Sequence, residues 1–172
     1  MPHLDAVHWA LASVLAMVLA WAAVTDVTRR QIPNASVLAI VGLFALWALA
    51  GAPAGAGSGL VAAAVGFAVG IALYIFKIMG AGDVKLFAAT ALFVGLGYLL
   101  MFALATALVG GIIAAISLLS RPRQTMVMLE LRGAGASGPG IPYGVPISIG
   151  GLLTLWAVVA GVSLADVLHS RI

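Results

Sequence analysis

Two aspartates lie at the borders of hydrophobic segments, where a membrane chain usually avoids charge. Asp26 ends one segment, and Asp83 opens another within the string Gly80-Ala81-Gly82-Asp83. The whole chain has only five acidic residues. Because an ionisable group at membrane depth is costly, such a group usually marks a functional site. Two carboxylates are also the smallest set of side chains that can carry out acid–base hydrolysis without a metal.

The chemistry expected of such a pair is the hydrolysis of an amide bond. Two carboxylates in contact cannot both ionise at low cost, so they share a proton. The ionised carboxylate takes a proton from water as the water oxygen attacks the carbonyl carbon, and the protonated carboxylate donates to the carbonyl oxygen. The sequence leaves open which aspartate starts ionised and whether the two side chains touch.

Each aspartate also has a purely structural interpretation. Asp26 could pair with Arg29 or Arg30 at helical spacing. Asp83 could cap the helix that follows it, and the glycines before it would then serve only a tight turn. In the functional interpretation, those glycines let an extended peptide approach the backbone beside Asp83. Two border aspartates at one depth favour the functional interpretation.

The composition indicates an integral membrane protein. The chain is 64% hydrophobic and 8% charged, with a mean hydropathy of +1.23, and a soluble core of 172 residues cannot bury so much apolar surface. We expect one domain over residues 1–172. The net charge of +3 does not indicate nucleic-acid binding, because the eight Lys and Arg residues form short clusters between apolar runs. The partners expected are therefore the lipid bilayer and a substrate.

Cysteine is absent, which excludes disulfides, a thiol nucleophile and a cysteine metal site. The histidines, His3, His8 and His169, lie near the chain ends, on the side opposite the aspartates. We therefore expect no metal site and no cofactor.

The fold class expected is all-α, a polytopic membrane protein of about six transmembrane helices. The hydrophobic segments cover residues 7–25, 35–50, 60–76, 84–94, 98–119 and 145–164. The fourth segment is short because one helix over residues 84–119 would be about 54 Å long, and Gly95-Leu96-Gly97 is the natural break. Ala62, Gly66 and Gly70 recur every fourth residue, which predicts a face for close helix packing.

Basic residues predict the orientation in the membrane. If the six helices alternate, every basic cluster between them falls on one side, and the positive-inside rule places that side in the cytoplasm. Both chain termini would then be extracytoplasmic, and both aspartates would lie at the cytoplasmic membrane border. The clusters are Arg29 with Arg30, Lys77 with Lys85, and Arg121 with Arg123 and Arg132.

Three further groups of residues could support a substrate cleft. Ile32-Pro33-Asn34 predicts the entry to the second segment, with Pro33 fixing the backbone and Asn34 as helix N-cap. Lys85 could tune the carboxylates or anchor its helix at the headgroups. Pro142-Tyr143-Gly144 could shape the cleft, or it could simply form a turn with Tyr143 in the interfacial aromatic belt.

Together these motifs resemble those of the type IV prepilin peptidases, polytopic aspartic proteases that cleave the leader from prepilins and pseudopilins. The resemblance covers nearly the whole chain and implies that Asp26 and Asp83 are catalytic. It assigns the other motif residues to the support of the site or the substrate cleft. The matching motifs are Asp26 followed by Ile32-Pro33-Asn34, then Gly80, Gly82, Asp83 and Lys85, and finally Pro142-Tyr143-Gly144.

The resemblance also implies a location and a substrate. The protein would lie in the bacterial inner membrane and cut prepilins after a glycine, between a basic leader and an apolar helix. Full-length bacterial members carry an N-terminal cytoplasmic insertion with a cysteine cluster that is associated with N-methylation. This chain looks like the short members that serve Tad-type (Flp) pili, so we do not expect N-methylation. The oligomeric state is not indicated.

Other interpretations remain open. A presenilin-like or signal-peptide protease also uses Gly-x-Gly-Asp, but Ile32-Pro33-Asn34 and the small size argue against it. A small transporter or channel with an acidic ion site would place its aspartates nearer the bilayer centre. It would also need polar residues along the other helices, whereas segments 35–50, 60–76 and 98–119 are almost free of them. A catalytically inactive assembly factor is disfavoured because both aspartates are present.

Overall fold

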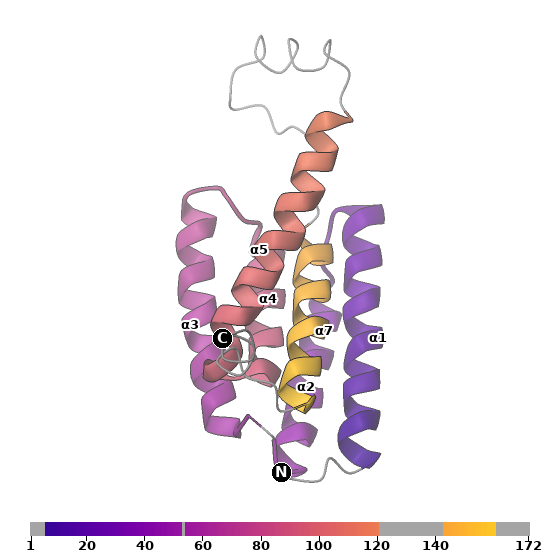
Figure 1. The fold of residues 1–172 in the computed structure, drawn as a ribbon, viewed down its shortest axis with the longest axis vertical. Helices are drawn as coiled ribbons and strands as arrows, with labels where there is room; N and C mark the ends of the chain where they lie inside the picture. The colour runs from indigo at the N-terminus through magenta and orange to yellow at the C-terminus, as the bar shows by residue number, and fades with distance from the viewer. Residues whose placement is uncertain (1–5, 53, 121–142, 161–172) are drawn as a thin grey trace, which may run out of the picture.

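The computed structural model describes residues 6–52, 54–120 and 143–160, and this part of the chain forms an all-α bundle (Figure 1). The long helices α1, α3 and α5 are apolar enough to cross a membrane, and α2 and α7 are shorter apolar helices. The predicted fold class of an all-α membrane protein is therefore confirmed. The helices are α1 (Ala6–Arg29), α2 (Asn34–Leu49), α3 (Ala56–Ile75), α4 (Ala81–Val94), α5 (Leu96–Leu119) and α7 (Gly144–Ala160).

Several helix ends differ from the prediction, and two of these differences concern the aspartates. Helix α1 continues to Arg29, so Asp26 lies in its last turn. Helix α4 begins at Ala81, so Asp83 lies inside its first turn. Residues 161–164 of the sixth predicted segment lie outside the described residues. So do His3, Arg121, Arg123, Arg132, Pro142 and His169.

The prediction that Asn34 caps α2 is wrong. Pro33 is the N-cap, with φ −63° and ψ 135°, and no side chain makes a capping hydrogen bond there. Because this extended backbone at Pro33 already ends the loop, Asn34 becomes the first helical residue. Both the backbone N–H and the hydroxyl of Ser36 donate to the carbonyl oxygen of Pro33. The side chain of Asn34 is thus available for a contact outside its own helix.

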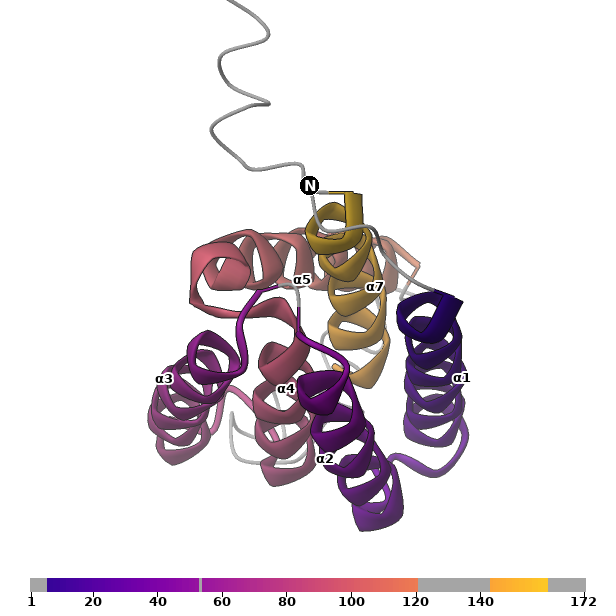
Figure 2. The same cartoon turned by 90° about the horizontal axis from the view of Figure 1, so that it is seen from below.

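The short helix α4 is the centre of the bundle. Helices α2, α3, α5 and α7 all pack against it, and Figure 2 shows it between α2 and α3. Its 14 residues rise about 21 Å, which is less than the roughly 30 Å of a bilayer core. Most side chains from Val84 to Val94 are buried. Since its neighbours are largely protein rather than lipid, α4 does not need the length of a full span.

Glycines on α3 allow the closest helix packing. A Cβ atom on Gly70 would lie 2.7 Å from Cγ1 of Val84, and one on Gly66 would lie 3.1 Å from the ring of Phe87. Ala62, on the same face, is fully buried. The predicted packing face is therefore confirmed, and it presses α3 against α4 directly beside Asp83.

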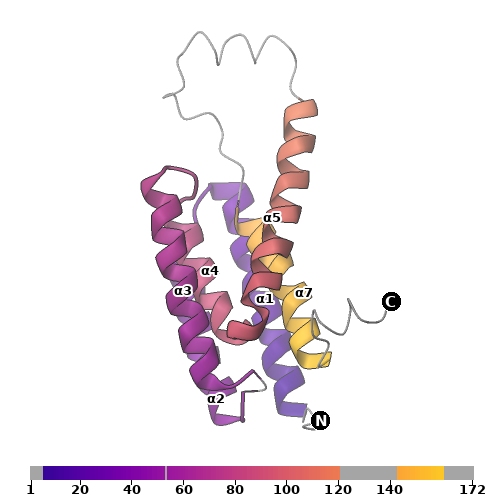
Figure 3. The same cartoon turned by 60° about the vertical axis from the view of Figure 1, so that its left-hand side comes forward.

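The turn from α4 to α5 occurs at Gly95. Its φ of +74° is a conformation that favours glycine, and a Cβ there would lie 2.8 Å from Cβ of Ala54. The N–H of Leu96 donates a 2.8 Å hydrogen bond to the hydroxyl of Ser58, which satisfies a free donor at the start of α5. Helix α5 then crosses the bundle at a tilt (Figure 3).

The helices alternate in direction. The α1–α2 and α3–α4 connections and the start of α7 lie at one end of the bundle, the upper end in Figures 1 and 3. The α2–α3 and α4–α5 connections lie at the other end. Asp26, Asp83 and Gly144 therefore share one end, as the alternation of segments predicts.

Candidate active site

The carboxylate of Asp26 is buried between α1 and α7. Asp26 is 7% exposed, and its Oδ2 accepts a 2.7 Å hydrogen bond from the backbone N–H of Gly144. A Cβ atom on Gly144 would lie 2.8 Å from both Cβ and Oδ2 of Asp26, so glycine alone permits this approach. The positive end of the α7 dipole also favours a carboxylate at this position.

Asp83 is the third residue of α4 and is half-buried. Its Oδ2 accepts a 3.1 Å hydrogen bond from the N–H of Gly80, the residue before the helix. A side chain at the third position that binds the N-cap backbone forms one half of a capping box. The capping role considered for Asp83 is thus present, but from inside the helix rather than from its N-cap. A Cβ on Gly80 would lie 2.8 Å from the same Oδ2.

The two carboxylates are close enough for their negative charges to repel each other. They come from positions far apart in the sequence, and the alternating helices bring them to one end of the bundle. The positive charge of Arg30 attracts Asp26. Arg30 follows α1 in a left-handed conformation, with φ +54°. Asp26 is therefore subject both to the attraction of an arginine, which we considered as its structural role, and to the repulsion of Asp83.

The two sequence motifs around the aspartates pack against each other. The Cβ of Ile32 lies where a side chain on Gly82 would extend, 3.2 Å from an ideal Cβ. The Nζ of Lys85 donates a 3.4 Å hydrogen bond to Oδ1 of Asn34. Ile32 therefore fills the space beside the Cα of Gly82, and the approach of an extended peptide to the backbone beside Asp83 stays a prediction. The glycine lets the α1–α2 loop lie against the first turn of α4.

The C-terminal motif contributes a group that the sequence did not indicate. Pro142 lies outside the described residues, but Tyr143 and Gly144 stand at the start of α7. We predicted only a cleft or a turn for this motif, whereas the N–H of Gly144 binds Asp26 directly. A glycine placed at the very start of an apolar segment is the one sequence signal that could have suggested such a contact.

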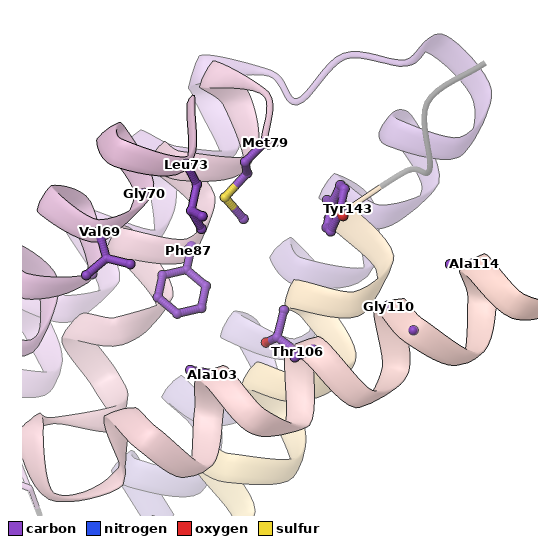
Figure 4. Close-up of a pocket in the computed structure, with 13 residues that line it drawn as sticks. Val69, Gly70, Leu73, Met79, Phe87, Ala103, Thr106, Gly110, Ala114 and Tyr143 are labelled. Atoms are coloured by element: carbon purple, nitrogen blue, oxygen red, sulfur yellow. The ribbon is translucent and has the colours of Figure 1, made fainter. Parts of the chain in front are cut away.

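A groove of about 380 Å³ lies between α3 and α5, beside this end of the bundle (Figure 4). Met79 and Tyr143 border it, and Phe87 of α4 and Thr106 of α5 line its depth. Met79 and Tyr143 immediately precede Gly80 and Gly144, whose N–H groups bind the two carboxylates. The groove thus begins next to the aspartates. The sequence did not indicate it.

Within the described residues, no group of three or more His, Asp or Glu side chains could hold a metal ion. His8 lies near the start of α1, at the opposite end of that helix from Asp26. It is buried with its ring edge-on to Trp47, at a centroid distance of 5.2 Å. Its distance from the aspartates agrees with the predicted placement.

Comparison with known proteins gives one match. Residues 13–115 match the model of the type IV leader peptidase family, which is more than half of the chain. The match includes Asp26, Asp83 and the motif residues around both, whereas Tyr143 and Gly144 lie beyond it. No curated protein and no solved structure matches the chain.

Proposed function

Because this chain belongs to the type IV leader peptidase family, we propose that it is an aspartic endopeptidase that uses Asp26 and Asp83 to remove the basic leader from prepilins. Membership of the family makes the protein a membrane peptidase. One observation supports the aspartic mechanism: Asp26 in the last turn of α1 and Asp83 in the first turn of α4 lie at the same end of the bundle, near enough for their negative charges to repel each other.

The proposed reaction needs no group beyond the two aspartates and water. One carboxylate is ionised and removes a proton from water, whose oxygen forms a bond to the carbonyl carbon of the scissile peptide. The other is protonated and donates to the carbonyl oxygen. As the tetrahedral intermediate collapses, the C–N bond breaks and a proton moves to the leaving nitrogen.

The position of the aspartates fits a substrate that enters from the membrane. We place the end of the bundle with Asp26 and Asp83 at the cytoplasmic border of the bacterial inner membrane, in agreement with the positive-inside rule. A prepilin helix in the bilayer would then present its leader junction at the depth of the carboxylates. Flp-type prepilins are the proposed substrate class, from the resemblance to the short family members.

The competing function is a small transporter or channel with an acidic ion site. Such a protein requires ionisable groups along a path through the bilayer. Both aspartates lie instead at one end of the bundle, and most residues of α4 beyond Asp83 are apolar and buried. This arrangement supports a reaction at the border rather than conduction through the centre.

Co-expression with an Flp-type prepilin tests the proposal. The intact protein should shorten the prepilin on a gel, and Asp26→Ala and Asp83→Ala should each abolish the shift while remaining in the membrane fraction. Gly42→Ala is a suitable control, because a Cβ at Gly42 meets no atom within 4 Å. Cleavage that persists in either aspartate variant would refute the mechanism.

A further inference from the structure

We propose that Ser148 and Gly151 of α7 are positioning residues that set the distance between Asp26 and Asp83. This inference rests on the proposed function, because it assumes that both carboxylates act in one reaction. The two residues act on the helices that carry the aspartates, at a point deeper in the bundle than the carboxylates themselves.

Helix α7 links the two helices that carry the aspartates. Helices α2 and α7 each pack against both α1 and α4, and Figure 2 shows α1 and α4 with α2 on one side and α7 on the other. Because packed helices do not deform continuously, the spacing of α1 from α4 depends on how closely α7 is seated against each of them.

Three residues of α7 face the helices that carry the aspartates. Gly144, Ser148 and Gly151 are separated by four and then three positions, which places them on one face of the helix. Gly144 lies beside Asp26, and its N–H binds the carboxylate. Ser148 and Gly151 continue the same face into the interior of the bundle, where both are buried.

The hydroxyl of Ser148 fixes the register of α7 on α1. It donates a 2.9 Å hydrogen bond to the carbonyl oxygen of Leu19, whereas the buried hydroxyls of Thr90 and Thr154 donate to carbonyls of their own helices. A hydrogen bond weakens steeply when its distance or angle changes. Together with the bond from Gly144, the bond from Ser148 therefore holds α7 against α1 at two points, which opposes both sliding and rotation.

Gly151 sets how closely α7 approaches α4. A Cβ atom on Gly151 would lie 2.6 Å from Cγ2 of Thr90 and 3.7 Å from Cδ1 of Leu19. Both side chains therefore lie against this glycine, and α1, α4 and α7 meet at one junction, which consists of Leu19, Thr90, Ser148 and Gly151.

The junction is related to the two aspartates in the same way. Leu19 precedes Asp26 by seven residues, and Thr90 follows Asp83 by seven residues. Seven residues are two helical turns, or about 10 Å along the axis. Since both helices run inward from the aspartate end, the junction holds α1 and α4 at the same depth below the two carboxylates. A change in the spacing there displaces one carboxylate relative to the other.

Gly151→Ala tests the spacing. Ordinary contacts between carbon atoms are about 3.5–4.0 Å, so the added methyl group must separate α7 from α4 by about 1 Å. We expect kcat for an Flp-type prepilin to fall about 100-fold, with KM unchanged. Adding Thr90→Ser removes the methyl group that is in the way and keeps the hydroxyl that binds Leu86. The double variant should regain at least tenfold in kcat over Gly151→Ala.

Ser148→Ala tests the register without adding an atom to the junction. We expect kcat to fall about tenfold, because α7 then shifts by less than the 1 Å that costs about 100-fold, and KM to stay unchanged. Thr154→Val is the matched control. It removes a buried hydroxyl from the same helix, but one that donates to Gly150 within α7, and it should cleave at the rate of the intact protein.

Spin labels report the spacing without any cleavage, because the chain contains no cysteine of its own. Labels at Val27→Cys and Lys85→Cys stand one and two residues after Asp26 and Asp83, and both positions are exposed. Pulsed EPR in lipid nanodiscs, without substrate, measures the distance between the labels. All variants are compared in this doubly labelled protein.

Gly151→Ala should change the mean distance between the labels by about 1 Å, Ser148→Ala should broaden the distance distribution, and Thr154→Val should leave it unchanged. The same distribution in all variants would overturn the proposal. So would a rise in KM at constant kcat, equal losses in Ser148→Ala and Thr154→Val, or a double variant no faster than Gly151→Ala. If the intact protein did not cleave the prepilin, the proposed function would fail, whereas the label distances would still test the junction.

Discussion

The backbone N–H of Gly144 donates a 2.7 Å hydrogen bond to the carboxylate of Asp26, across 118 positions of the chain. The bond joins the first turn of α7 to the last turn of α1. A side chain on Gly144 would occupy the space of the Asp26 carboxylate, because its Cβ would lie 2.8 Å from Oδ2. We conclude that Gly144 positions Asp26, both by donating a hydrogen bond and by having no side chain.

We predict that Gly144→Ala lowers kcat for prepilin cleavage about 100-fold, because a catalytic group displaced by about 1 Å loses roughly that factor. The added methyl group must push Asp26 or α7 aside. Membrane insertion should remain normal, and KM should change little because the variant displaces a catalytic group without removing a side chain that could bind the substrate. Kinetics with purified protein and a model prepilin measure both constants.

Gly97→Ala is the matched control for Gly144→Ala, since a Cβ at Gly97 meets no atom within 4 Å. It should cleave at the rate of the intact protein. If Gly144→Ala also cleaved at that rate, Gly144 would have no positioning role.

Gly70→Ala should lower the stability of the protein. The new Cβ would lie 2.7 Å from Cγ1 of Val84, and overpacking of this kind costs about 1–3 kcal/mol. Activity should fall as well, because Val84 adjoins Asp83. Thermal unfolding in detergent tests the prediction against Gly42→Ala, which has open space around the added methyl group. An unfolding temperature of Gly70→Ala at or above that of the control would contradict close packing between α3 and α4.

Lys85→Met should have only a small effect on the rate of prepilin cleavage. The lysine donates a 3.4 Å hydrogen bond to Asn34 at an exposed position. Exposed contacts of this kind change the folding equilibrium constant by a factor of less than about five. If Lys85 serves to join α4 to the start of α2, then removing its charge leaves the shape of the pH–rate profile unchanged. A clear shift of that profile in Lys85→Met would show instead that the lysine tunes the carboxylates.

The sequence predicted the helices and the shared end of the aspartates because both follow from simple physics. Apolar runs of sufficient length identify membrane helices, and alternation of those helices places Asp26 and Asp83 at the same end. The face of Ala62, Gly66 and Gly70 was also predictable, since small residues at four-residue spacing mark close packing. These properties depend on local composition and spacing alone.

The contacts within the site could not be predicted in the same way. The bond from Gly144 to Asp26 and the packing of Ile32 on Gly82 depend on how distant segments meet in three dimensions. The N-cap of α2 is Pro33, one residue before the predicted Asn34. The side chain of Asn34 therefore makes no cap and accepts a hydrogen bond from Lys85.

The most direct test of the mechanism is the rate of leader removal by Asp26→Asn, Asp83→Asn and the double variant, each purified and given an Flp-type prepilin. Asparagine keeps the shape of the side chain but cannot exchange a proton as a carboxyl group does. We predict that each single change lowers the rate about 1,000-fold, and that the double change lowers it no further because the pair acts as a unit. A single variant that keeps more than about a tenth of the rate, or a double variant in which the two losses multiply, would contradict catalysis by a shared pair.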